Sequence, residues 1–312
     1  MRVFESLDAI PEHEFSGGTA VAIGKFDGVH LGHQMLLQRI FDVGAARGTD
    51  PVVFTFANNP LSFLRPELCP EPLMSKAQRL DVLAAEGVSS CVMVPFDADL
   101  AAVSAEDFVS QVLVGQLRVR HLCVGNDFRF GHGGTGDPVL LVQLGEELGF
   151  SVEVIGDVED DALGKVSSSR VRAAIVQGDV ASAARMLGRP TEVRGTVVRG
   201  DARGRELGFP TANLGGPLEG LVPADGVYAG WATVGDQTYA AAISVGANVT
   251  FDPDGESRVE AYLLDFAANI YGEEIAISFV ERLRGMAAFA TVDALVTRMH
   301  DDVRETRTLL GQ

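Results

Sequence analysis

The stretch TAVAIGKFDGVHLGHQMLLQRIF, residues 19–41, decides the fold of the first half of this chain. Residues 19–24 are small and mostly apolar, as in a buried strand, and a glycine-punctuated turn follows them. Beyond His33 the apolar side chains recur at helical spacing, so the stretch predicts a strand, a turn and a helix. A strand that leads into a helix in this way is the repeating unit of a parallel sheet covered by helices.

The same alternation continues to about residue 155. Apolar runs predict strands at Ala20–Gly24, Pro51–Phe56, Ser90–Val94, His121–Gly125 and Ser151–Ile155. Amphipathic stretches between them predict helices near residues 33–47, 76–87, 105–118 and 139–148. In an open parallel sheet, ligands bind beyond the carboxyl ends of the strands. The turn after the first predicted strand therefore stands where a site is expected.

The pattern changes after residues 188–190. Short runs rich in Val, Thr and Tyr predict strands at Glu192–Val198, Gly226–Val234, Thr238–Val245, Val259–Phe266 and Glu274–Val280. Short strands at regular spacing favour an antiparallel barrel or sandwich, and residues 292–310 predict a final amphipathic helix. We expect two domains, an α/β domain over residues 1–184 and a β domain over residues 185–312.

Composition narrows the class of protein. The 312 residues carry 25 basic against 43 acidic side chains, a formal charge of −18, which argues against non-specific nucleic-acid binding. A local pocket could still hold an anionic small molecule. The three cysteines, Cys69, Cys91 and Cys123, form no CxxC pair. Early acidic residues argue against a signal peptide, and no apolar run reaches the ~20 residues that span a bilayer. We expect a cytoplasmic protein with no membrane partner.

Two histidines, His30 and His33, lie in the turn and at the predicted helix start. Unpaired backbone N–H groups and the helix dipole favour an anion there, and two imidazoles three residues apart add donors. A phosphate chain is the natural ligand. Two alternatives remain open from the residues alone: a zinc site, which would need His121 or His132 as further ligands, and two ordinary structural histidines.

The string RGTVVRGDARGRELGFPTANL, residues 194–214, carries the second chemical signal. Its glycines allow the backbone to fold tightly and approach a ligand. Thr211 and Asn213 occupy alternate positions, so their side chains would share one face of an extended strand. A hydroxyl and an amide oxygen suit Mg²⁺ beside nucleotide phosphates. A glycine-rich hairpin with a turn cap is the open alternative.

Both strings resemble one known family. The pattern GxFDGVHxGHxxL, with VGNDFRFG (124–131) and KVSSSRVR (165–172), resembles the nucleotidylyltransferase half of bacterial bifunctional riboflavin kinase/FAD synthetases. GFPTAN, PADGVYAGW (223–231), AISVGANVTF (242–251), RVEAYLLDF (258–266) and YGEEIAISFVERLR (271–284) resemble the riboflavin kinase half. The resemblance covers nearly the whole chain in family order. It implies a Rossmann-like nucleotidylyltransferase domain followed by an antiparallel β-barrel with a C-terminal helix.

In the first half, the resemblance implies that His30 and His33 are catalytic and hold ATP phosphates. Ser168, Ser169 and Arg172 would close over the triphosphate from the other side, and Ser169 stands where the family usually has threonine. Asp127 would help to position both flavin and nucleotide. The implied nucleotide-binding residues are Gly24, Phe26, Asp27, Gly28, Asp127, Lys165, Ser168, Ser169 and Arg172.

In the second half, the resemblance implies that Glu260 is the general base of the kinase. A carboxylate within hydrogen-bond reach would accept the proton of the ribityl hydroxyl, which is otherwise a poor nucleophile. Thr211 and Asn213 would bind Mg²⁺. Nucleotide contacts are implied for Gly200, Arg205 and Gly208, and a flavin contact for Arg284.

The implied activity is bifunctional. The C-terminal half would phosphorylate riboflavin with ATP to FMN, and the N-terminal half would adenylylate FMN with a second ATP to FAD and pyrophosphate, both with Mg²⁺. One departure concerns the family's Pro-His-Pro, which reads Asn58–Asn59–Pro60 here and places Asn59 at a flavin-binding position. An impaired adenylyltransferase half is therefore one alternative. A non-catalytic flavin carrier and a different nucleotidyl acceptor are two others, and a homo-oligomer is compatible with the sequence.

Overall fold

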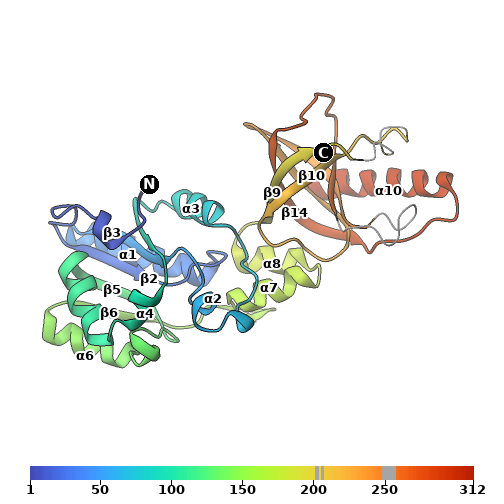
Figure 1. The fold of residues 1–312 in the computed structure, drawn as a ribbon. Coiled ribbons are helices and arrows are strands. Elements are labelled where there is room, and N and C mark those ends of the chain that lie inside the picture. The colour runs from blue at the N-terminus through green and yellow to red at the C-terminus, as the bar shows by residue number, and fades with distance from the viewer. Residues whose placement is uncertain (201–203, 205–206, 248–257) are drawn as a thin grey trace. The chain divides into compact units, whose positions relative to one another are not determined.

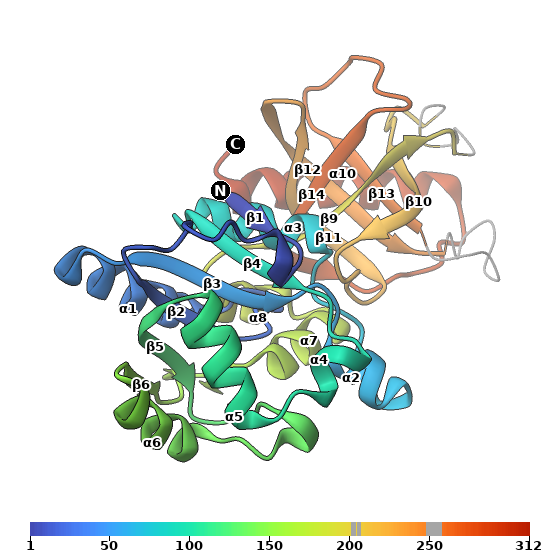
Figure 2. The same ribbon diagram turned by 60° about the vertical axis from the view of Figure 1, so that its left-hand side comes forward.

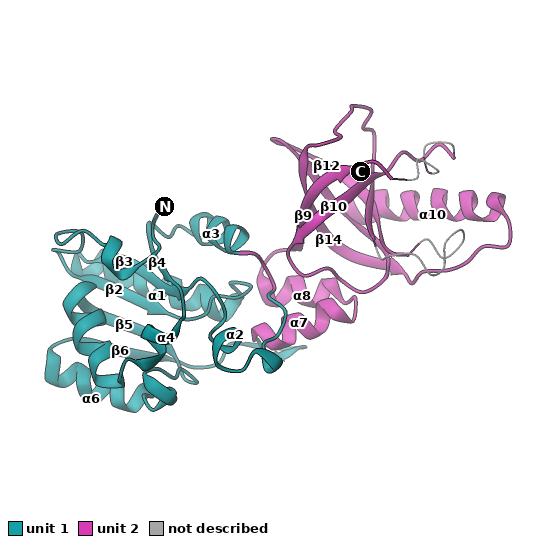
Figure 3. Cartoon of the chain, viewed as in Figure 1, with its two compact units in different colours: residues 1–72, 76–166 teal, residues 73–75, 167–312 magenta. Residues whose placement is uncertain are grey.

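The computed structural model describes residues 1–200, 204, 207–247 and 258–312 (Figure 1). The chain forms two compact units, one of residues 1–72 and 76–166 and one of residues 73–75 and 167–312 (Figure 3). Residues 167–184, which we assigned to the first domain, thus lie in the second compact unit. The border at 184/185 between the two activities stays a prediction.

The first unit contains a six-stranded sheet in the order β1-β4-β3-β2-β5-β6, with every neighbouring pair parallel. Its strands are β1 (Arg2–Phe4), β2 (Thr19–Ile23), β3 (Asp50–Phe56), β4 (Ser90–Val94), β5 (Val119–Gly125) and β6 (Ser151–Ile155). The predicted parallel sheet is confirmed. Strand β1 was not predicted, because three residues are too few to show a pattern.

Strand order explains where a site can form. From β2 the chain adds β3 and then β4 on one side of the sheet, and it later adds β5 and β6 on the other. The order therefore reverses between β2 and β5, and in open α/β sheets the crevice at such a reversal binds ligands. The histidine turn follows β2, and Asp127 follows β5, so the two loops flank the reversal point.

Helices cover both faces of this sheet (Figure 2). Val21 and Ile23 of β2 belong to the core that also contains Phe108 and Val112, whereas α1 contacts β2, β3 and β5 from the other side. The helices are α1 (Leu31–Arg47), α2 (Pro60–Leu64), α3 (Lys76–Ala85), α4 (Ala98–Ala102), α5 (Ala105–Asp107), which continues as a π-helix (Phe108–Gln116), and α6 (Pro138–Leu148). Short 3₁₀ helices lie at Leu7–Ala9, Pro66–Leu68 and His132–Gly134, and a small hairpin joins β7 (Glu159–Asp160) and β8 (Gly164–Lys165).

The second unit is a closed antiparallel barrel in the order β10-β13-β12-β11-β14-β9. Its strands are β9 (Thr191–Val198), β10 (Ala212–Glu219), β11 (Gly226–Val234), β12 (Gln237–Gly246), β13 (Arg258–Leu263) and β14 (Glu274–Arg284). The barrel is therefore confirmed over the sandwich. The predicted strands omitted β10, whose glycines and proline hide its periodicity. Helix α10 (Val292–Leu310) has the predicted bounds.

Helix α8 (Val180–Leu187) packs against β9 and β14 of this barrel, and α7 (Ser168–Val176) packs against α8. Arg282 of β14 donates from Nη1 to the Gln177 carbonyl at 3.5 Å and from Nη2 to the Asp225 carbonyl at 2.6 Å. A Cβ at Gly178 would lie 2.9 Å from the Tyr228 hydroxyl, so the turn between the helices admits no side chain there. These contacts explain why the helix pair belongs to the barrel unit. None of the described helices has the length and apolar character that a membrane crossing requires.

Candidate functional sites

The histidine turn has a strained backbone. Between the end of β2 at Ile23 and the start of α1 at Leu31, Phe26 and Val29 adopt φ values of +51° and +41°, which are unfavourable for residues with a Cβ. Gly28, with φ +85°, lies between them. Such strain persists where the surroundings over-determine the conformation, typically at functional sites.

The turn brings the two histidine rings together. The His30 and His33 rings stack with centroids 3.8 Å apart, and the Phe26 ring lies 4.8 Å from that of His33. His30 is the N-cap residue of α1 and is 8% exposed. A Cβ at Gly32 would lie 3.1 Å from the His30 ring, which explains the glycine between the histidines. Two imidazoles therefore stand at a helix N-terminus, where an anion is favoured.

Burial first, and then the neighbouring His30 and Arg79, hold the pKa of His33 well below its usual value. The ring is therefore neutral at pH 7 and acts through hydrogen bonds and not through a full charge. In the described structure its Nδ1 atom is buried and makes no hydrogen bond. Buried polar atoms normally have partners, so this atom marks a place where a ligand group could supply one.

Arg79 is a member of this site that the sequence analysis missed. It lies on α3, is only 9% exposed, and donates to backbone carbonyls in the turn after β2 and at the end of β3. A single arginine in an amphipathic helix gives no local signal, because the burial of its guanidinium depends on strands more than 20 residues away in sequence. The one signal that could have indicated Arg79 is its place on the buried face of the predicted helix.

Asp127 and Lys165 lie at the other side of the strand-order reversal. Asp127 is exposed in the loop after β5, and Lys165 forms an ion pair with Asp157, Nζ to Oδ1 2.8 Å. The hydrogen bond to Asp157 raises the pKa of Lys165, and the charge of Asp127 adds to the effect. Asp127 is therefore close enough to Lys165 to act on it electrostatically, although the described partner of Lys165 is Asp157.

Asn58 and Asn59 both fasten their loop. Asn59 Oδ1 accepts from the Leu61 amide at 3.1 Å and caps α2. Asn58 Oδ1 accepts from the Phe96 amide at 2.8 Å, and its Nδ2 donates to the Phe96 carbonyl at 3.0 Å. Asn58 thus ties the loop after β3 to the loop after β4, and Asn59 fixes the start of α2. The flavin contact expected of Asn59 stays a prediction.

The serine motif begins helix α7. Ser167 is the N-cap of α7, with its side chain accepting from the Arg170 amide at 3.4 Å. Arg172 Nη1 donates to the Ser168 carbonyl at 3.4 Å. Ser168, Ser169 and Arg172 belong to the second compact unit, whereas the histidine pair belongs to the first. Their closure over the triphosphate stays a prediction.

In the barrel, the structure brings together the residues of the predicted kinase site. Asn213 of β10 stands opposite Glu260 of β13 in the register. Thr211 Oγ1 donates to Glu260 Oε2 at 3.3 Å, and Asn213 Nδ2 donates to Thr211 Oγ1 at 3.3 Å. Thr211 and Asn213 therefore do share one face. The cluster presents hydroxyl, carboxylate and amide oxygens, the hard donors that Mg²⁺ accepts, so these residues fit the ion.

Glycines shape the approach to this cluster. A Cβ at Gly200 would lie 2.6 Å from Asn213 Oδ1, so residue 200 must lack a side chain for the amide to keep its place. Gly208 has φ +87°, which other residues rarely adopt. Phe209 follows and packs edge-on against Tyr262 of β13 and His300 of α10. Arg205 lies outside the described residues.

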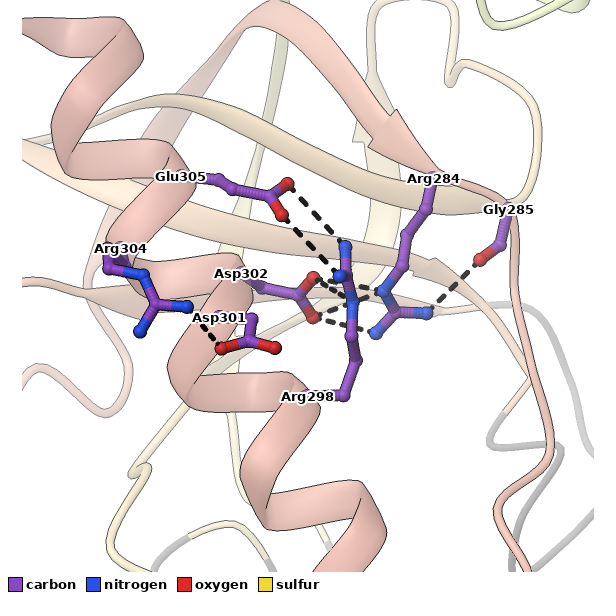
Figure 4. Close-up of polar contacts among 7 residues, drawn as sticks. All are labelled: Arg284, Gly285, Arg298, Asp301, Asp302, Arg304 and Glu305. Carbon is purple, nitrogen blue, oxygen red and sulfur yellow. Dashed lines mark hydrogen bonds and ion pairs between the residues drawn. The ribbon is translucent and has the colours of Figure 1, made fainter.

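Arg284 ends β14 and is held by the C-terminal helix (Figure 4). Its Nε and Nη2 donate to the Asp302 carboxylate, with a shortest distance of 2.7 Å, and Arg298 binds the same carboxylate from one turn earlier in α10. Asp302 is 4% exposed, so this is a buried ion-pair network. The flavin contact expected of Arg284 stays a prediction, made by a side chain that is already oriented.

A third cluster lies in the first unit. Among the described residues, one group of three potential metal ligands lies within 4.8 Å, and it consists of His121, Cys123 and Glu153. Arg39 binds the Glu153 carboxylate at 2.8 and 2.9 Å, while burial and the nearby Glu153 raise the pKa of the Cys123 thiol to about 12. Because the Cys123 thiol is neutral and Arg39 occupies the Glu153 carboxylate, the group is an ion-pair network and not a set of free metal ligands. The group includes neither His30 nor His33, so it gives no support to the zinc alternative.

Comparisons with known proteins match both halves of the chain. The family model described as FAD synthetase matches residues 12–170, and that described as riboflavin kinase matches residues 187–310. The bifunctional riboflavin kinase/FMN adenylyltransferase of Pseudomonas fluorescens is 37% identical over 96% of this chain and 94% of its own length. That of Escherichia coli K12 is 36% identical over 100% and 97%.

A solved structure also matches over nearly all of the chain. A crystal structure described as a macrolide-efflux protein from Streptococcus pneumoniae has a TM-score of 0.84 and 33% identity, and the match covers 98% of each chain. The two family models match in this order along the chain, and the two relatives match over nearly their full length. The chain belongs to the family of bifunctional riboflavin kinase/FMN adenylyltransferases.

Proposed function

We propose that this chain makes FAD from riboflavin in two ATP-dependent steps, carried out by two separate sites. The barrel phosphorylates riboflavin to FMN, and the parallel-sheet unit transfers AMP from a second ATP to FMN. The observation that carries the proposal is the convergence of Thr211, Asn213 and Glu260, since Thr211 and Glu260 are 49 residues apart and meet only in the barrel. The stacked histidines at the start of α1 are the matching feature of the other site.

In the kinase step, Glu260 accepts the proton of the ribityl primary hydroxyl. The oxygen attacks the γ-phosphorus of ATP, the bond to the β-phosphate oxygen breaks, and ADP leaves. Thr211 Oγ1 and Asn213 Oδ1 would hold Mg²⁺, which neutralises charge on the transferring phosphoryl group. Thr211 uses its hydroxyl hydrogen to donate to Glu260 in the described structure, so an oxygen lone pair would be directed towards the ion. Gly200 leaves Asn213 the space it needs.

In the adenylyl transfer step, a phosphate oxygen of FMN attacks the α-phosphorus of ATP, and pyrophosphate leaves. The attacking group is itself a phosphate, so the protein needs no side-chain nucleophile. His30 and His33, with the N-terminal amides of α1, would stabilise the charge that builds on the α-phosphate. Their stacking fixes both rings before the reaction, which is the condition under which such donors act most strongly.

A metal ion, further nucleotide contacts and a cellular location complete the proposed function. Mg²⁺ serves both steps, and Ser168, Ser169, Arg172 and Lys165 contact the nucleotide of the adenylyl transfer step. We place the protein in the cytoplasm, where its substrates and reduced cysteines would be stable; Cys69, Cys91 and Cys123 are all free. No described contact favours an impaired adenylyltransferase half, because Asn58 and Asn59 have their own roles in fastening the loop.

Product analysis tests the proposal. The purified chain, incubated with riboflavin, ATP and Mg²⁺, should give FMN and then FAD on chromatography, and FMN with ATP should give FAD and pyrophosphate. Glu260→Gln should abolish the first reaction and spare the second, whereas His30→Ala should do the reverse. Formation of neither product by the wild-type chain, or equal loss of both activities in either variant, would contradict the two-site assignment.

A further inference from the structure

Arg79 is a buried cation beside the histidine turn that no motif includes. Its guanidinium joins the histidine turn to the end of β3: Nη1 donates to the Lys25 carbonyl, two residues beyond β2, at 2.9 Å, and Nη2 donates to the Phe56 carbonyl at 2.7 Å. Nη2 also lies 3.2 Å from the Ala57 carbonyl. Arginine keeps its charge in proteins, so a full positive charge is buried here.

Lys25 is the link between this arginine and the strained turn. Its carbonyl accepts a second hydrogen bond, from the buried Thr55 hydroxyl at 3.1 Å. A carbonyl oxygen has two lone pairs, so both are used, and the peptide that leads into Phe26 has a fixed orientation. Phe26 follows with φ +51° and places its ring against His33. Arg79 therefore constrains the residue on which the His33 ring rests.

The charge of Arg79 also reaches His33. After burial, His30 and then Arg79 lower the pKa of His33. Asp27, in the same turn, acts on Arg79 and opposes the effect of burial on the pKa of the arginine. The arrangement thus contains two separable contributions, a forked hydrogen-bond clip and a positive charge.

We propose that Arg79 is a positioning residue for adenylyl transfer: it clips the Lys25 carbonyl to the end of β3 and thereby holds Phe26, His33 and His30 in the geometry that receives the polyphosphate. The inference rests on the proposed function of this site. A misplacement of the donors by about 1 Å can cost about 10²-fold in rate, which sets the scale of the expected effect.

Three variants separate the contributions. Arg79→Lys keeps the charge but loses the fork, Arg79→Met loses both, and Thr55→Val removes only the second hydrogen bond to Lys25. We expect kcat for FAD formation from FMN to fall by about 10²-fold in Arg79→Lys and Arg79→Met, and by less in Thr55→Val. The limb of the pH profile that reports His33 should move to higher pH in Arg79→Met alone, because only that variant removes a charge that lowers the pKa of His33.

The same chain supplies the controls. FMN formation from riboflavin, measured in each variant, should stay within about twofold of wild type because it uses the barrel site. Arg39→Met is the matched control in the same unit, since Arg39 binds Glu153 and not the strand ends. It should leave FAD formation unchanged. Should Arg79→Met fail to fold, Arg79→Lys carries the test, with its unfolding temperature recorded.

The outcomes are distinguishable. A folded Arg79→Lys variant with wild-type FAD formation overturns the positioning role, and so does a parallel fall of both activities. A loss of FAD formation in Arg39→Met equal to that in Arg79→Met also overturns it, because any lost arginine in the unit would then suffice. Absence of FAD formation in the wild-type chain is a different result, and it refutes the proposed function itself.

Discussion

Replacing Gly200 with alanine should inactivate the kinase site while leaving the barrel folded. The added Cβ would lie 2.6 Å from Asn213 Oδ1, 2.7 Å from its Cγ and 2.8 Å from its Nδ2. Ordinary van der Waals contact begins at 3.4 Å, so the amide must move by about 3.4 − 2.6 = 0.8 Å. Asn213 is 8% exposed on a paired strand, so its backbone cannot retreat and its amide must rotate away.

A rotated amide no longer presents its oxygen beside Thr211. A displacement of this size costs about 10²-fold in rate, or about 2.7 kcal/mol of transition-state stabilisation. The assay is FMN formation from riboflavin, ATP and Mg²⁺, with kcat and KM measured against Mg²⁺ concentration. Loss of the metal ligand should appear as a higher Mg²⁺ requirement, whereas FAD formation from supplied FMN should not change.

A matched glycine change supplies the control. Gly235 lies at the tip of the β11–β12 hairpin with φ +57°, and a Cβ there would meet no described atom within 4 Å. Asparagine tolerates this conformation, so Gly235→Asn should keep kinase activity within about twofold of wild type. The reasoning is refuted if Gly200→Ala forms FMN at the wild-type rate and with the wild-type Mg²⁺ requirement.

Three further predictions concern the two sites and the C-terminal helix. Thr211→Ala should lower FMN formation by about 10²-fold and spare FAD formation, as chromatography of the products would check. Asp302→Asn should lower the free energy of unfolding in urea by about 3–5 kcal/mol, because two arginines would be left around a buried neutral amide. Asp301→Asn is the control: it breaks an exposed ion pair and should cost less than about 1 kcal/mol. As the pH falls below about 6.5, the unfolded chain binds a proton at His33 that the folded chain excludes, so the free energy of unfolding should fall with pH. Between about pH 7.5 and about pH 5.5, the unfolding temperature of His33→Gln should therefore fall by less than that of wild type. Equal falls would contradict the lowered pKa of His33.

Much of the molecule could be predicted from the sequence because its signals are local. Continuous apolar runs predicted five of the six parallel strands, and helical spacing predicted the bounds of α10, since both signals depend only on the local burial of each element. The motif spacing placed Thr211 and Asn213 on one face, and the structure confirms their contact. The extent of strand β10 beyond Asn213, to Glu219, was missed because glycine and proline conceal its alternation.

The sequence by itself thus determined most of the element types, a parallel sheet followed by antiparallel strands, and the motif residues of both sites. Only the tertiary structure decided which distant groups meet: Thr211 with Glu260 across the barrel, Arg79 with the turn after β2 and the end of β3, and Asn58 with Phe96. It also joined α7 and α8 to the barrel unit. The physical reason is that a residue's burial and its hydrogen-bond partners come from packing between remote segments, whereas sequence periodicity reports only the local backbone and its buried face.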